Sequence, residues 1–298
     1  MRYNKPALTI DQQIDKLKQR GLVIKDANKA AHYLSNISFY RLRAYTYPFQ
    51  DNEDPDHPFI KTVTFEQIMS LYVFDRKLRL LVLDAIEKIE ISLRTKMIYE
   101  FSIKHNPYWY CEKAHFIDNS KYKSQLDEIN VEIDRSREDF IEHYKTKYDP
   151  NEYPPSWMAL EIVSLGLLSK MYKNISSSCG TKRRIANYYG LRNESILENW
   201  IQCFSVIRNI CAHHSRLWNR RAMPITMPNK PIHQFTKFIP QRNYKLYAYL
   251  SCIVYILKII NPDNTFVAKL KKIMSIYQDL NIKEMGFPEN WLEDPFWA

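Results

Sequence analysis

Glycine is scarce in this chain, and its scarcity excludes the common nucleotide-binding loops. The 298 residues include five glycines, and these are widely spaced. P-loops and dinucleotide-binding fingerprints each need several glycines within a few residues. His-Glu-x-x-His and paired-acid metal motifs are also missing. We therefore expect neither a nucleotide or other cofactor nor a bound metal.

Paired cysteines and a long apolar run are lacking as well. The five cysteines are odd in number and form no Cys-x-x-Cys pair, which indicates a reduced, cytoplasmic protein without a disulfide framework. The amino terminus carries no apolar signal core. The longest apolar stretch, Leu246 to Ile260, is too short to span a membrane and includes Ser251 and Lys258. We expect it to be a buried helix.

Charge is what the chain has in excess. The formal net charge is +10 and the isoelectric point is about 9.2, while apolar residues make up 45% of the composition. This apolar content is sufficient for a core. The positive charge favours a polyanionic partner, either nucleic acid or an anionic membrane surface, with ordinary variation in charge as the alternative. Of the two partners we expect RNA and no membrane.

The apolar periodicity is mostly helical, so the expected fold class is mainly α. The expected helices cover residues 9–20, 26–34, 64–104, 121–147, 156–172, 182–189, 195–220, 244–260 and 264–280. Alternating aromatic residues from Phe39 to Tyr47, and a short run from Phe59 to Thr64, predict a β-hairpin. We expect an N-terminal module over residues 1–63 and a helical domain over 64–298, with a polar helical insertion near 121–147.

The segment from Ile207 to Arg220 is the strongest chemical signal. Arg208, Asn209 and His213 place a guanidinium, a carboxamide and an imidazole within two helical turns. A guanidinium binds phosphate through paired hydrogen bonds, and an imidazole transfers protons near neutral pH. Together they predict chemistry on a phosphodiester.

Helix geometry raises a difficulty for this site. Asn209 and His213 are four residues apart and share a face, whereas Arg208 and His213 differ by roughly 140° around the axis. The two converge only if the arginine reaches around, the helix is distorted, or a second subunit completes the site.

The neighbouring polar residues have two interpretations each. His214 lies about 100° from His213, so it either contacts substrate or packs. Arg216 and Arg220 are four residues apart and either follow an RNA backbone or form a solvated face. Trp218 is expected in the core.

An arginine followed at similar spacing by a histidine occurs a second time in the chain, at Arg137 and His143, which are six residues apart. It lies in a strongly charged segment, and Glu138 is an anion where a phosphate site disfavours one. We interpret this match as chance.

Ordered sequence blocks carry a wider resemblance. They include Leu17–Leu22, Ser38–Leu42, Tyr72–Arg79, Ile86–Arg94, Trp157 with Glu161, Arg208–His214 and Met285–Trp291. These blocks resemble the Abi-like (abortive infection) proteins of bacteria, and the arginine–histidine spacing resembles the signature of HEPN ribonucleases.

The resemblance implies a helical bundle, a homodimer and metal-independent RNA cleavage. His213 would act as general base or acid, Arg208 would stabilise charge on the phosphate, and Asn209 would orient His213 or bind phosphate. The implied role is phage defence by an endoribonuclease, restrained by a bound RNA or a partner protein.

Charged residues on the long helix have two possible roles. Glu87, Glu90 and Arg94 share one stripe, and they form either a surface ion pair or a polar layer that positions Arg208. Glu161 is a further candidate for that layer.

Two alternatives to an enzyme remain at this level. The chain is either a non-catalytic protein that holds a structured RNA, or a toxin component that acts through protein contacts on its aromatic surface.

Overall fold

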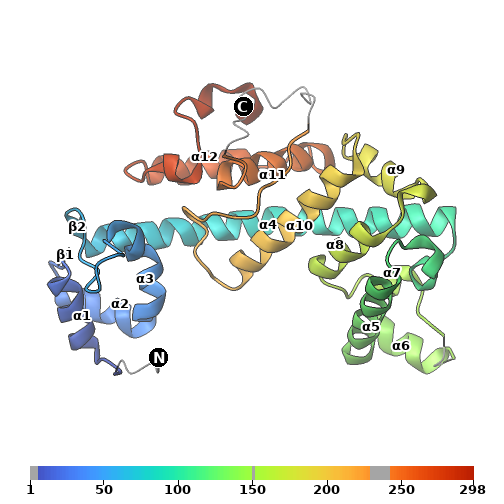
Figure 1. Ribbon diagram of the computed structural model, residues 1–298, viewed down its shortest axis with the longest axis horizontal. Helices are drawn as coiled ribbons and strands as arrows, with labels where there is room; N and C mark the ends of the chain where they lie inside the picture. Colours follow the sequence, from blue (N-terminus) through green and yellow to red (C-terminus); the bar gives the residue numbers. More distant parts are fainter. Residues whose placement is uncertain (1–5, 150–151, 229–241) are drawn as a thin grey trace. The chain divides into compact units, whose positions relative to one another are not determined.

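The computed structural model describes residues 6–149, 152–228 and 242–298. Twelve α-helices and one two-stranded sheet occur in this part of the chain (Figure 1), so the expected mainly α class is confirmed. Short 3-10 helices lie at Tyr47–Phe49, Trp109–Cys111, Lys113–His115, Ser177–Cys179, Ile282–Met285, Trp291–Glu293 and Pro295–Trp297. None of the described helices combines the length and hydropathy of a membrane span.

The chain divides into two compact units. The first contains residues up to Arg79 together with Lys271–Asn281, and the second contains Leu80–Leu270 with Ile282–Ala298. The long helix α4, Phe65–Lys104, contributes residues to both units.

The first unit begins with two capped helices. Helix α1, Ile10–Gln19, starts at a capping box in which Thr9 and Gln12 exchange hydrogen bonds. Helix α2, Ala27–Asn36, is capped by Asp26. Strand β1, Leu22–Val23, pairs in parallel with β2, Val63–Thr64.

The expected hairpin is wrong, because its first strand is a helix. Helix α3 covers Phe39–Thr46, and the Ser38 hydroxyl accepts the amide of Arg41 at 3.2 Å. Leu42, Tyr45 and Thr46 are buried at helical spacing. The same residues therefore fit both the alternation of a strand and the burial pattern of a helix. The Ser38 cap stabilises the helix.

A buried polar network joins α3 to α4. The Tyr45 hydroxyl donates to Oδ2 of Asp75 at 2.7 Å, and Arg79 donates both to the Tyr45 oxygen at 2.9 Å and to the Asp75 carboxylate. Asp75 is fully buried and Arg79 nearly so. Burial and the adjacent carboxylate raise the pKa of the Tyr45 hydroxyl. The network accounts for the Tyr72–Arg79 block in structural terms.

Helix α4 starts where the sequence predicts. The Thr64 hydroxyl accepts the amide of Gln67, and Gln67 accepts the amide of Thr64, which forms a second capping box. Phe74, Leu78, Val82, Ala85 and Leu93 are buried along one side.

Two expected helices are interrupted in the second unit. Residues 121–147 form α5, Asn119–Arg135, and α6, Asp139–Lys147, because Lys145 donates to the carbonyls of Ile133 and Asp134 that end α5. Residues 156–172 form α7, Ser156–Ala159, and α8, Leu165–Asn174, which begins at a Ser164 cap. Freed backbone groups are satisfied at both breaks.

The remaining helices of the chain follow the predicted order. They are α9, Thr181–Tyr188, α10, Glu194–Ala212, α11, Leu246–Ile260, and α12, Phe266–Ile276. Helix α8 packs along α10 (Figure 1), and α9 packs against α10 as well.

The basic residues of α9 are each paired with a glutamate from another helix. Lys182 reaches Glu198 at 2.6 Å, and Arg184 reaches Glu100 at 2.6 Å. The Lys182 side chain is 1% exposed and also donates to the carbonyl of Ile175 at 2.9 Å. Lys182 therefore ties α9 to α10 and to the end of α8.

The variant Glu198→Gln is expected to lower the free energy of unfolding by about 3 kcal/mol, because it leaves the buried Lys182 ammonium without its counter-ion. Urea denaturation measures this. Glu128→Gln breaks the exposed Lys170–Glu128 pair and serves as the control, with a change below about 0.5 kcal/mol. Equal effects of the two variants would contradict a special role for the buried pair.

Candidate active site

The candidate site lies at the carboxyl end of α10. The helix ends at Ala212, so the expected extension to Arg220 is wrong. The His213 amide donates to the carbonyl of Asn209 at 2.9 Å, and the Ser215 amide donates to that of Ile210 at 3.0 Å. His214 has a φ of 57°, in the left-handed region. Such a turn closes a helix in the way a terminal glycine usually does.

Asn209 and His213 face outward. Gln202, Val206, Asn209 and His213 are exposed and recur at helical spacing, while Ile210 on the other side is buried. Val206 is 38% exposed, an apolar residue on an otherwise polar stripe. The outward stripe of α10 thus presents an imidazole and a carboxamide to the outside of the second unit.

Arg208 is half-buried beside them. Its Nη1 lies 3.4 Å from Oδ1 of Asn209, at the long end of the hydrogen-bonding range. Within the described residues, neither the Arg208 guanidinium nor the His213 imidazole makes any other side-chain hydrogen bond or ion pair. The structure therefore brings Arg208 and Asn209 together but does not join Arg208 to His213.

The segment after α10 is anchored by apolar side chains. Leu217 and Trp218 are buried, as expected for Trp218. Arg220 is exposed, and its Nη1 lies 3.4 Å from the carbonyl of Arg216 in a turn. Arg216 and Arg220 therefore lie in a turn after α10 and not in the helix expected over residues 195–220, and RNA binding by the two arginines stays a prediction.

Lys245 fixes the same segment, a role that sequence patterns do not indicate. Its Nζ donates to Oδ1 of Asn219 at 2.9 Å and to the carbonyl of Glu284 at 2.8 Å. Asn219 has a φ of 48°, and a β-carbon on Gly286 would lie 2.7 Å from that of Lys245. Any side chain at position 286 would therefore clash with Lys245, so this position requires glycine.

Glu90 and Arg94 form a nearly buried pair at 2.9 Å, with side chains 13% and 12% exposed. Arg94 also donates to the carbonyl of Val163 at 2.8 Å, just before α8, while Glu161 lies 4.0 Å away and is 51% exposed. Arg94 thus links α4 to the turn that leads into α8, the helix packed on α10. Of the two interpretations of Glu90 and Arg94, the exposed surface pair is therefore wrong, and a role in positioning Arg208 stays a prediction.

Glu87 stands apart from this link. It is exposed, and it makes no hydrogen bond or ion pair with any part of the chain that the structure describes. No hydrogen bond joins Arg94 to Arg208 among these residues either.

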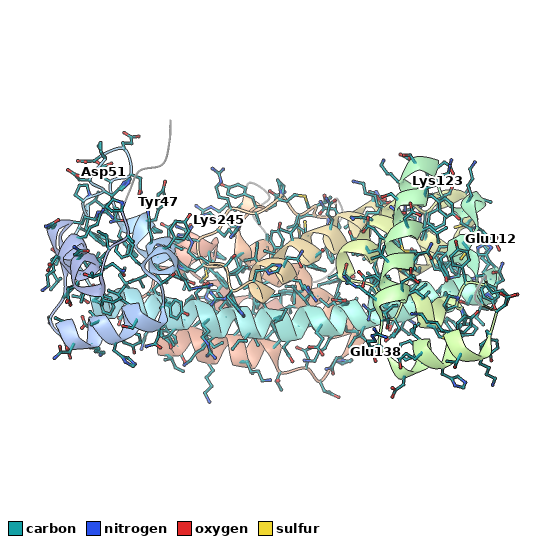
Figure 2. The ribbon with its side chains drawn as sticks, turned by 90° about the horizontal axis from the view of Figure 1, so that it is seen from below. Tyr47, Asp51, Glu112, Lys123, Glu138 and Lys245 are labelled. Atoms are coloured by element: carbon teal, nitrogen blue, oxygen red, sulfur yellow. The ribbon has the colours of Figure 1, made fainter. Side chains whose placement is uncertain are left out.

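The second arginine–histidine match is not arranged as a site. Arg137 lies before α6, is 90% exposed and pairs with Glu142 at 3.7 Å. Figure 2 shows Glu138, labelled, at this end of the α5–α6 pair. A paired guanidinium beside two acidic residues is poorly suited to phosphate.

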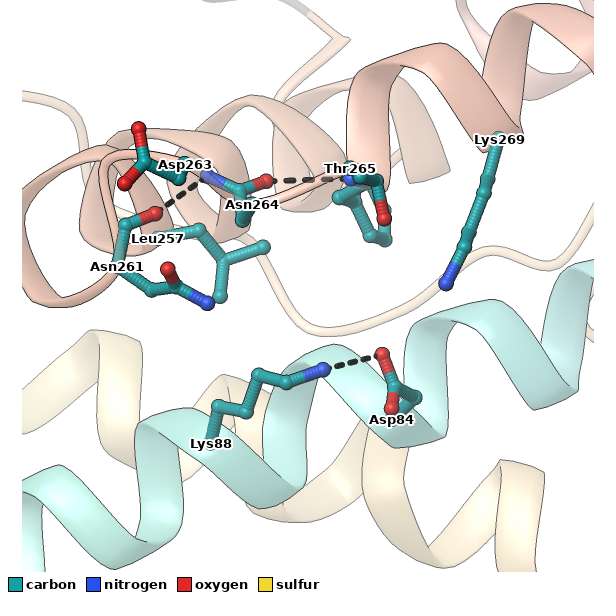
Figure 3. A pocket seen from close by; sticks show the side chains of 9 residues that line it. Asp84, Lys88, Leu257, Asn261, Asp263, Asn264, Thr265 and Lys269 are labelled. Atoms are coloured by element: carbon teal, nitrogen blue, oxygen red, sulfur yellow. Dashed lines mark hydrogen bonds and ion pairs between the residues drawn. The ribbon is translucent and has the colours of Figure 1, made fainter.

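Two hollows in the second unit lie away from the motif residues. Figure 3 shows a pocket of about 130 Å³ where the Lys88–Asp84 pair, at 2.6 Å, faces Asn261, Asn264 and Lys269. A broader cleft of about 810 Å³ is lined by Glu132, residues 135–138, Phe140, Glu161 and Ile162. No cluster of three metal-ligating side chains was found in residues 6–149, 152–228 and 242–298.

Comparison with known proteins identifies one family. The sequence profile described as Abi-like protein matches residues 32–219, which is more than half of the chain. No curated protein and no solved structure matches.

Proposed function

Because the chain belongs to the Abi-like protein family, whose name indicates a part in abortive-infection defence against phage, we propose that it is a metal-independent endoribonuclease of the HEPN type. One observation carries the proposal. Arg208, Asn209 and His213 are gathered on the last turn of α10, with the amide and the imidazole exposed. These groups suffice for phosphodiester chemistry without a cofactor.

The proposed reaction is an attack within the RNA strand. The 2′-oxygen forms a bond to the adjacent phosphorus while the bond from phosphorus to the 5′-oxygen breaks. The products are a 2′,3′-cyclic phosphate and a 5′-hydroxyl, so no water enters this step. His213 accepts the 2′-proton or supplies the proton that the 5′-oxygen takes up. Arg208 stabilises the negative charge on the non-bridging oxygens.

A second copy of the chain is part of the proposal. Arg208 and His213 are not joined within one chain, and the stripe that carries His213 also exposes Val206. Pairing of two such stripes about a two-fold axis covers the apolar side chain and brings two sets of groups together.

The test is RNA cleavage in the presence of EDTA, with analysis of the product ends. Cleavage that persists in EDTA, leaves 2′,3′-cyclic phosphate ends and stops when the RNA carries a 2′-deoxy sugar at the cut position is expected. Products with 3′-hydroxyl ends, or equal cleavage of the deoxy substrate, would exclude the mechanism.

The net charge of +10 favours a second candidate, a protein that holds a structured RNA without cutting it. This candidate predicts tight RNA binding, no cleavage by the unmodified protein, and unchanged affinity in the variants Arg208→Ala and His213→Ala.

The backbone conformation of His214 gives a test that does not depend on its imidazole. Since its φ of 57° lies in a region that glycine adopts readily and β-branched residues avoid, His214→Val should be less stable than His214→Gly by about 1–2 kcal/mol. Thermal melts measure this difference, and cleavage rates test the imidazole. If His214→Gly loses activity with a normal melt, the imidazole has a direct role.

A further inference from the structure

The positive charge of this protein is concentrated in one segment. No aspartate or glutamate occurs between Glu198 and Asp263, and nine of the 43 lysines and arginines lie there. The rest of the chain is therefore nearly balanced in charge. This acid-free segment contains Arg208 and His213 of the candidate site and continues through α11.

Two parts of the acid-free segment pair with each other through their backbones. The amide of Ala222 donates to the carbonyl of Tyr244 at 3.0 Å, and the amide of Ile225 donates to that of Asn243 at 3.1 Å. The Asn243 side chain returns a bond to the carbonyl of Ile225 at 3.1 Å. We call residues 219–225 and 242–245 the basic ribbon. It is an ordered element that begins six residues after His213.

The basic ribbon carries exposed guanidinium groups. Arg220, Arg221 and Arg242 are all exposed. The Arg221 guanidinium lies 4.7 Å from the ring centre of Tyr244, within the range of a cation–π contact. Neither Arg221 nor Arg242 forms an ion pair with a carboxylate in the parts of the chain that the structure describes.

Lys245 holds the basic ribbon in place and adds to its field. Its Nζ, on the second part of the ribbon (Figure 2, Lys245 labelled), donates to Asn219 at the start of the first part and to the carbonyl of Glu284 near the end of the chain. Burial lowers the pKa of Lys245; the charges of Arg221 and Arg242 lower it further, against the opposing effect of Glu284. The cations are therefore close enough to repel one another, and a polyanion placed over them relieves this repulsion.

We propose that the basic ribbon is a phosphate-binding subsite that holds the RNA strand flanking the bond to be cut. That the bound strand flanks a cleaved bond rests on the proposed function. Phosphate binding by Arg221 and Arg242 is independent of it. Guanidinium groups form paired hydrogen bonds with phosphate, so the subsite grips the backbone irrespective of base sequence. The RNA would then contact the protein at the basic ribbon as well as at the candidate active site.

The test uses the double variant Arg221→Gln/Arg242→Gln in the full-length chain. The probe is a fluorescent, single-stranded 2′-O-methyl RNA, which binds without being cut, and the readout is Kd across a salt series. We expect Kd to rise at least tenfold, and the slope of log K against log salt to become shallower by about 1.4, since each single-strand contact contributes about 0.7. Arg137→Gln removes an exposed charge in the α5–α6 region and is the matched control.

The outcomes separate this inference from the proposed function. If the unmodified protein cleaves RNA and the double variant binds like Arg137→Gln, the subsite is refuted and the nuclease stands. If nothing is cleaved but the double variant loses affinity and salt dependence, the nuclease is refuted and the subsite stands. The subsite would also be refuted if the double variant lost binding to anionic phospholipid vesicles but bound RNA as the unmodified protein does. Thermal melts confirm that the exposed substitutions leave the fold intact.

Discussion

The variant His213→Ala is expected to lower the rate of RNA cleavage about a thousandfold, because it removes the group that transfers the proton. Arg208→Ala is expected to lose about 100- to 1,000-fold, since charge on the phosphate then develops without a guanidinium beside it. Single-turnover cleavage of a labelled RNA, in EDTA, measures both rates. Both side chains lie at the surface end of α10, so the loss is expected in catalysis and not in folding.

Two control variants sharpen this prediction. Gln202→Ala changes an exposed residue on the same stripe of α10 and should leave the rate within a factor of about two. Arg208→Lys keeps the charge and loses the paired hydrogen bonds, so an intermediate rate indicates direct phosphate contact. Unchanged cleavage by His213→Ala would remove this residue from the mechanism.

Mixing the two inactive variants tests for a composite site. If each site takes its arginine and its histidine from different subunits, a mixed dimer regains one intact site of two. An equal mixture that exchanges subunits freely should then recover about a quarter of the original activity. If each site lies within one subunit, the mixture stays inactive.

The second large effect is expected in the first unit. Asp75→Asn removes the counter-ion of Arg79, whose side chain is 6% exposed, and should lower the free energy of unfolding by about 3–5 kcal/mol. Tyr45→Phe loses one hydrogen bond of the network and should cost about 1 kcal/mol.

Denaturant unfolding followed by circular dichroism measures both changes. Asp84→Asn is the control, because it breaks an i,i+4 pair of the same kind whose side chains are 42% and 54% exposed. A loss in Asp75→Asn no larger than that of the control would show that the buried network adds no net stability.

Most helices could be predicted from the sequence because their starts carry side-chain signals. Thr9, Asp26 and Thr64 each cap a helix, and the apolar spacing of α4 is helical throughout. Helix α3 could not be predicted, since its aromatic residues fit both periods. The breaks at residues 136–138 and 160–164 depend on bonds from distant residues, Lys145 and Arg94, which local sequence does not reveal.

The candidate site was only partly predictable in the same way. Arg208, Asn209 and His213 are close together in the sequence, but the helix end at Ala212 depends on a left-handed histidine where glycine is the usual signal. The attachment of Lys245 to Asn219 joins residues 26 positions apart, and a single sequence holds no trace of that contact. The absence of acidic residues between Glu198 and Asp263 can be read from the sequence, whereas the backbone pairing that forms the ribbon cannot.

The burial of the fold's ion pairs has a practical consequence for preparing this protein. The Asp75–Arg79 and Lys182–Glu198 pairs are shielded from solvent, so dissolved ions screen them weakly, whereas the arginines of the basic ribbon stand in water. A concentrated sodium chloride wash on a chromatography column should therefore strip co-purifying host RNA from the folded chain. Nucleic acid that resists such a wash would be held by something other than exposed charge, and would merit sequencing.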